Sequence, residues 1–157
     1  MKFRGWIAVL LVLGLPVATA LGQSGSLSAP DSEKVARRLG DIMNGIQARH
    51  VKLWFAGKAA NWELADYELL QLKADLTEAA LNYSGIPVSN VTTLATQMHS
   101  VADAVAAKDG RKFAKAFGDL TEACNNCHQS MGRGFLTMRV PTEQPFSNQV
   151  FSPPGKK

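Results

Sequence analysis

Two cysteines and a histidine lie together near the C-terminal end of the sequence, in the segment Cys124-Asn125-Asn126-Cys127-His128. The order Cys-x-x-Cys-His is the attachment signature of c-type haem. Two thiols three residues apart on a helical turn can both form thioether bonds to the haem vinyl groups, and the next residue can present its imidazole to the iron. The segment therefore predicts one covalently bound haem c, with Cys124 and Cys127 as thioether residues and His128 as the proximal iron ligand.

Three other chemistries use the same residue types. A disulfide between Cys124 and Cys127, the two cysteines of the chain, can form in an oxidising compartment and would leave His128 without a role. Thiol–disulfide exchange through Cys-x-x-Cys normally occurs beside a βαβ unit, and the sequence shows no strand alternation of useful length. A structural zinc site needs four ligands, and no second pair has zinc-finger spacing. Covalent haem is the interpretation that uses all three side chains.

The first twenty residues have the features of a secretory signal peptide. They comprise a basic start at Lys2 and Arg4, an apolar run over 6–17 and an A-x-A cleavage site at 18–20. The apolar run is shorter than a membrane-spanning helix requires, although an uncleaved anchor is the alternative. Cleavage near Ala20 predicts a periplasmic protein, and c-type haem is attached outside the cytoplasm.

Charge and composition indicate an ordinary globular domain. The 157 residues include 17 Lys and Arg against 13 Asp and Glu, so the formal net charge is +4. Loss of Lys2 and Arg4 with the signal peptide lowers this charge to +2, so no DNA or RNA partner is expected. A hydrophobic content of 46% with 19% charged residues is typical of a packed core, and the length suits one domain.

Apolar residues recur at three- and four-residue steps from about residue 32 to residue 131, as in amphipathic helices. The pattern predicts four helices separated by breaks that contain Gly, Pro or Asp, over about 32–55, 61–83, 89–107 and 111–131. The first break covers 56–60. The predicted N-caps are Asp31 or Ser32, Asn61, and Ser89 or Asn90.

Short connections make neighbouring helices antiparallel. The predicted fold class is therefore all-α, an up-down-up-down antiparallel four-helix bundle over 31–134. A flexible Gly/Ser-rich leader over 21–30 precedes the bundle. Four prolines over 135–157 predict an extended tail, and Phe146 and Phe151 suggest that part of this tail lies back on the bundle.

A signal peptide, four helices and Cys-x-x-Cys-His on the last helix resemble the cytochrome c′ family over roughly residues 32–133. The resemblance implies that a residue of the first helix faces the distal side of the haem. That residue is often apolar, which leaves the iron five-coordinate, and it is Met in low-spin relatives. The chain departs from the family where Gly132 stands four residues after the haem His, a place often held by Arg, and Arg133 comes one later. The segment 52–57 and the long tail are also atypical, so a divergent branch is indicated.

The distal iron ligand is predicted from helix register. Antiparallel first and fourth helices would place the end of the fourth beside the start of the first, so Leu39 and Met43 lie near the level of His128. His50 is seven residues beyond Met43, roughly 10 Å further along the axis. We therefore expect Met43 as the distal ligand. The alternatives are a vacant site covered by Leu39 or Met43, or ligation by His50, Met98 or another residue. His50 is otherwise expected to make a polar contact or lie at the surface.

The predicted function is single-electron transfer by an exported cytochrome, with His/Met ligation raising its potential relative to His/His. The alternative is a five-coordinate haem protein that binds nitric oxide or carbon monoxide. An enzyme is not expected, because no acid, base or nucleophile constellation accompanies the motif.

Two further groups of residues bear on partners. A basic run precedes and opens the fourth helix, at Lys108, Arg111, Lys112 and Lys115. It predicts either a solvated face or a contact for an acidic redox partner protein. Aromatic residues gather away from the motif, at Trp54, Phe55, Trp62 and Tyr67. They either close the end of the core or form the face of a homodimer or another complex.

Overall fold

The computed structural model describes residues 37–155, so the predicted signal peptide (1–20) and leader (21–30) lie outside the described residues. Four helices make up the body: α1 (Leu39–Lys58), α2 (Trp62–Asn82), α3 (Val88–Ala106) and α4 (Gly110–Ser130). The described part of the chain contains no strand. The all-α four-helix bundle is confirmed. Within the same residues, no helix combines the length and the apolar character needed to cross a membrane.

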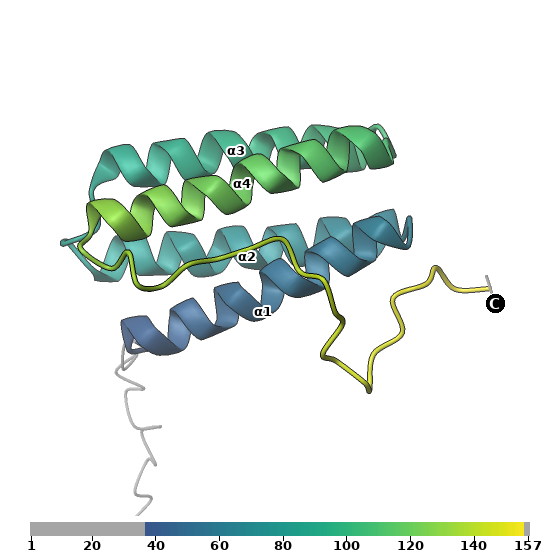
Figure 1. Cartoon of the computed structure of the whole chain (residues 1–157), viewed down its shortest axis with the longest axis horizontal. Coiled ribbons are helices and arrows are strands. Elements are labelled where there is room, and N and C mark those ends of the chain that lie inside the picture. The colour runs from purple at the N-terminus through teal and green to yellow at the C-terminus, as the bar shows by residue number, and fades with distance from the viewer. Residues whose placement is uncertain (1–36, 156–157) are drawn as a thin grey trace, which may run out of the picture. The chain divides into compact units, whose positions relative to one another are not determined.

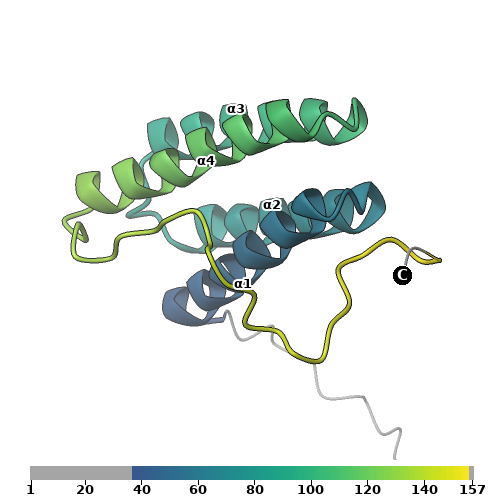
Figure 2. The ribbon, with the colours of Figure 1, turned by 45° about the vertical axis from the view of Figure 1, so that its right-hand side comes forward.

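The helices pack as two pairs, α1 against α2 and α3 against α4 (Figure 1). In Figure 1 the chain reverses direction at each of the three connections. Helices α2 and α3 join the pairs on one side, and the contact between α1 and α4 on the other side is the least extensive of the four. Figure 2 shows the C-terminal segment leaving α4 and crossing toward α1 on that less closely packed side.

Aromatic rings fill the core toward the end of α1 and the start of α4. Phe113 lies 6.1 Å from Trp54 and 6.0 Å from Trp62, centroid to centroid, and is 1% exposed. A Cβ on Gly57 would lie 2.2 Å from the Phe113 ring, so only glycine allows α1 to approach this closely. Trp54 and Trp62 therefore close this end of the core as predicted, whereas Tyr67 is 51% exposed and takes no part.

The predicted bounds of the first helix are wrong at both ends. Arg38 is extended, so α1 begins at Leu39, and the predicted caps at 31–32 lie outside the described residues. At the other end, 56–58 are helical and the chain turns only afterwards, at Ala60 with φ of 55°. Burial of Gly57 against Phe113 explains the extension, because tertiary packing outweighs the weak helix propensity of glycine.

Two of the connections contain side chains that cap the helix after them. The Asn61 side chain accepts from the Leu64 N–H at 3.3 Å, which confirms the predicted cap of α2. The Asp109 carboxylate accepts from the Arg111 and Lys112 N–H groups, at 3.0 Å each, and these bonds lower the pKa of Asp109.

The predicted caps of α3 are wrong. Helix α3 begins directly after Pro87, with no side-chain cap, so Ser89 and Asn90 already lie within its first turn. Pro87 itself is extended and precedes the helix, so its missing N–H removes no hydrogen bond from α3. The Asn90 amide is used elsewhere, since it reaches across to α4.

Candidate haem-attachment site

The Cys-x-x-Cys-His segment occupies the last two turns of α4. Cys124 and Cys127 are free thiols, both partly buried and packed against the main hydrophobic cluster. Burial, helped by the neighbouring Cys127, raises the pKa of Cys124 to about 11, and burial also raises the pKa of Cys127. A catalytic exchange thiol needs a lowered pKa, so these environments argue against thiol–disulfide exchange.

The tautomer of His128 follows from its partner. Its Nδ1 lies 2.6 Å from the backbone carbonyl oxygen of Leu136, in the segment that follows α4. A carbonyl oxygen can only accept, so Nδ1 carries a proton, and in the neutral ring the free electron pair is then on Nε2. Metal-binding histidines are normally held in this way, with the second nitrogen bonded to a carbonyl or carboxylate. His128 is thus prepared to act as a ligand through Nε2.

Asn125, between the two cysteines, fixes the tail to the motif. Its side-chain amide donates to the Met138 carbonyl at 3.0 Å and accepts from the Met138 N–H at 2.7 Å. Together with the bond from His128 to Leu136, these contacts hold the start of the tail against the last turns of α4. Asn125 has no role in the chemistry that the sequence predicts. Its position inside the motif, and the ability of an amide to both donate and accept, were the only available signals.

Helix α3 supports the motif from another direction. The Asn90 amide nitrogen lies 3.5 Å from the Cys127 sulfur and 2.8 Å from the Ser130 hydroxyl. The Cys127 sulfur also lies 3.8 Å from the sulfur of Met131, directly after the helix. The motif is therefore positioned by α3 as well as by the tail.

Met43 shares a small apolar cluster with Met131, three residues after His128 in the sequence. It is partly buried against a small cluster of Ile42, Ala79 and Ile86, and Met131 packs against the same cluster. These neighbours are apolar, and ligation of iron by Met43 stays a prediction.

His50 is buried, with 1% of its surface exposed. Its Nε2 lies 2.9 Å from the hydroxyl of Thr121, and its ring centroid lies 4.4 Å from that of Phe117. The expected polar contact is confirmed, and the alternative of a surface position is wrong. Burial lowers the pKa of His50 to about 4, so the ring is neutral at physiological pH.

The contact with Thr121 also fixes the tautomer of His50. The single hydroxyl proton of Thr121 goes to the Phe117 carbonyl at 2.9 Å, so the hydroxyl must accept from Nε2–H of His50. The free electron pair is then on Nδ1. Among the described residues, Nδ1 of His50 is the buried side-chain nitrogen or oxygen without a hydrogen-bond partner.

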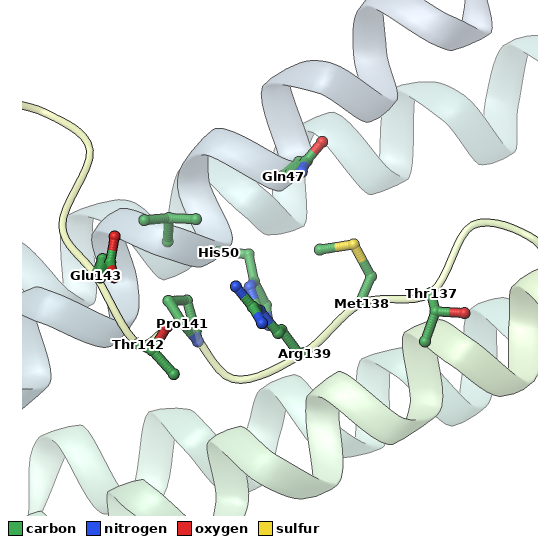
Figure 3. Close-up of a pocket in the computed structure, with 9 residues that line it drawn as sticks. Gln47, His50, Thr137, Met138, Arg139, Pro141, Thr142 and Glu143 are labelled. Carbon is green, nitrogen blue, oxygen red and sulfur yellow. The ribbon is translucent and has the colours of Figure 1, made fainter.

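A pocket of about 290 Å³ adjoins His50 (Figure 3). Helix α1 contributes one wall, with Gln47, His50 and Val51. The tail contributes the other wall, with Thr137, Met138, Arg139, Pro141, Thr142 and Glu143. The tail residues that line the pocket directly follow Leu136, whose carbonyl holds His128.

The donor set fits a haem better than a bare metal ion. Within residues 37–155, no three or more His, Cys, Asp and Glu side chains are grouped so that they could hold a metal ion. A structural zinc site takes four protein ligands, whereas a porphyrin supplies four nitrogens itself and needs protein ligands only on its two faces. One imidazole with a free Nε2, beside two thiols on the same helical turn, satisfies the proximal half of that requirement.

No protein-family model, curated protein or solved structure matches the chain.

Proposed function

We propose that this protein is an exported c-type cytochrome that carries one covalent haem and transfers single electrons. The observation that carries the proposal is the hydrogen bond from His128 Nδ1 to the Leu136 carbonyl, beside two free thiols on the same helical turn. The bond places an N–H on Nδ1, so Nε2 is the nitrogen of His128 that could bind iron. The signal peptide predicted from the sequence would place the protein in the periplasm, where this cofactor is attached.

Each side chain of the motif then has a defined role. Cys124 and Cys127 would hold the haem, each by addition of its S–H bond across one vinyl group, so that two C–S bonds would form and no group would leave. His128 would hold the iron through Nε2, while the Leu136 carbonyl orients the ring and would make it a more basic ligand. The bound haem supplies an iron centre that changes between the ferric and ferrous states.

A five-coordinate haem protein that binds nitric oxide or carbon monoxide is the second candidate. The observation in its favour is the pocket of about 290 Å³ between α1 and the tail, which could admit a small ligand and is lined by Thr137 and Met138, directly after the Leu136 carbonyl that holds His128. The two candidates share the proximal half of the site. The reduced absorption spectrum separates them, since sharp low-spin bands indicate two axial ligands and a broad high-spin band indicates one.

The test is to express the full chain with a cytochrome c maturation system and purify it from the periplasm. We expect a coloured protein whose denatured mass exceeds that of the processed chain by one haem, and a pyridine haemochrome spectrum typical of two thioether bonds. A double Cys124→Ser, Cys127→Ser variant should lose the covalent haem.

His128→Ala should keep the covalent haem but change the spectrum, because the thioether bonds survive and the proximal ligand is lost. The matched control is His99→Ala, since His99 is 79% exposed on α3 and should leave the spectrum unchanged. A wild-type protein that is colourless and has the mass of the bare polypeptide would refute the proposal.

A further inference from the structure

The environment of His50 places it on the face of α4 that carries His128. Thr121 and His128 are seven residues apart on α4, close to two helical turns, so both side chains project from nearly the same face. His50 of α1 is hydrogen-bonded to Thr121. Helical side chains also lean toward the helix N-terminus, which directs His128 toward the turn of Thr121. His50 therefore contacts the side of α4 that carries His128, about two turns (~10 Å along the axis) before it.

His50 has an electron pair that nothing else in the described structure uses. Its Nε2 is bonded to Thr121, and its buried Nδ1 has no hydrogen-bond partner. Native proteins seldom leave such an acceptor unsatisfied, so this nitrogen is available to a ligand that enters the pocket. Arg139 lines the same pocket, but no hydrogen bond joins it to His50 within residues 37–155.

Some of the tail residues that line the pocket beside His50 also hold the haem motif or lie next to residues that do. Thr137 and Met138 line it from the tail, and the Met138 backbone is bonded twice to Asn125. One residue earlier, the Leu136 carbonyl holds His128. The free space next to His50 thus lies on the same segment that orients the proximal ligand.

Met43 and His99 do not need a further bonding partner, unlike the buried Nδ1 of His50. Met43 packs within the apolar cluster around Ile42, and it does not line the pocket. A thioether in an apolar cluster needs no partner, because it is only a weak acceptor. His99 is exposed and pairs with Asp103 on its own helix, at 3.7 Å.

We propose that His50 supplies the sixth ligand of the haem iron, an inference that rests on the proposed function. The ligand atom is Nδ1, which carries the free electron pair, while Nε2–H keeps its hydrogen bond to Thr121 and so orients the ring. His/His ligation makes the iron low-spin, closes the distal position to carbon monoxide and gives a lower potential than His/Met ligation. It favours electron transfer over gas binding.

The test compares matured holoproteins by absorption, electron paramagnetic resonance and carbon monoxide titration. The wild type should be low-spin and should not bind carbon monoxide. His50→Gln should lose the low-spin signal and gain carbon monoxide binding. Met43→Leu, a volume-conserving control, should behave as wild type. A high-spin wild type, or a low-spin His50→Gln beside a high-spin Met43→Leu, would overturn the assignment of His50.

A second variant separates ligand loss from misfolding. His50→Gly removes the side chain, and added imidazole should restore the low-spin spectrum if the ring was an iron ligand. Failure of imidazole to restore it, in a variant with wild-type helix content, would count against ligation. The mass of the denatured protein separates a failure of this inference from a failure of the proposed function. Covalent haem with an unchanged His50→Gln spectrum contradicts only this inference, whereas absence of haem from the wild type refutes the proposed function and this inference with it.

Discussion

The Nδ1 atom of His128 lies 2.6 Å from the carbonyl oxygen of Leu136, eight residues further along the chain. The orientation of the histidine is therefore set by the tail and not by α4 alone. Gly132, between the two, has φ of 68° and lets the chain fold back directly after the helix. The segment after the motif is thus part of the proposed site.

Asn125→Ala should loosen the tail where it meets the motif. The substitution removes the bonds to the Met138 N–H and carbonyl, each worth about 1 kcal/mol. We expect the hydrogen-exchange protection of the Met138 amide to fall by roughly tenfold or more. Asn126→Ala is the matched control, because Asn126 is exposed in the same motif. Equal protection of Met138 in both variants would show that Asn125 does not hold the tail.

Gly57→Ala should destabilise the bundle despite the better helix propensity of alanine. The new Cβ would meet the Phe113 ring at 2.2 Å, and overpacking of a core typically costs about 1–3 kcal/mol. Urea denaturation measures this cost. Gly118→Ala, within α4, has no atom within 4 Å of the added Cβ and should instead stabilise by up to about 1 kcal/mol. A Gly57→Ala variant as stable as wild type would contradict the close approach of α1 to Phe113.

Arg49→Met should be strongly destabilising, because it isolates a buried carboxylate. Glu68 on α2 is 1% exposed, and its carboxylate lies 3.0 Å from the Arg49 guanidinium. Removing one partner of a buried pair typically costs about 3–5 kcal/mol, whereas replacing both partners by apolar residues is often near neutral. The double variant Arg49→Met, Glu68→Leu should therefore recover most of the loss in the free energy of unfolding. No recovery in this double-mutant cycle would mean that the pair is not the source of the effect.

The haem-free chain should lose stability as the pH falls from about 6.5 to about 4. Burial lowers the pKa of His50 from 6.5 to about 4 in the folded state, so the unfolded chain binds a proton first. The contribution is complete above pH 6.5 and lost below pH 4, and it amounts to at most about 3 kcal/mol. Urea titrations across this range should show a shallower slope for His50→Gln. His99→Gln, at an exposed position, should keep the wild-type slope.

Local sequence patterns were sufficient to predict the number of helices. The three- and four-residue apolar steps depend only on helix geometry, and the cap at Asn61 depends on its own next three residues. The haem prediction likewise rests on five consecutive residues, so no distant contact is needed to make it. Helix ends were less predictable, since Gly57 reads as a break in the sequence but packs against Phe113 in the fold.

Only the tertiary structure decided what surrounds the motif. The partner of His50 is Thr121, 71 residues away, and the partner of Asn125 is the backbone of Met138 in a tail without regular structure. Such pairings depend on how closely α1 approaches α4 and where the tail crosses between them. That approach results from the packing of all four helices together, so no local pattern reveals the burial of His50 or its unpaired nitrogen.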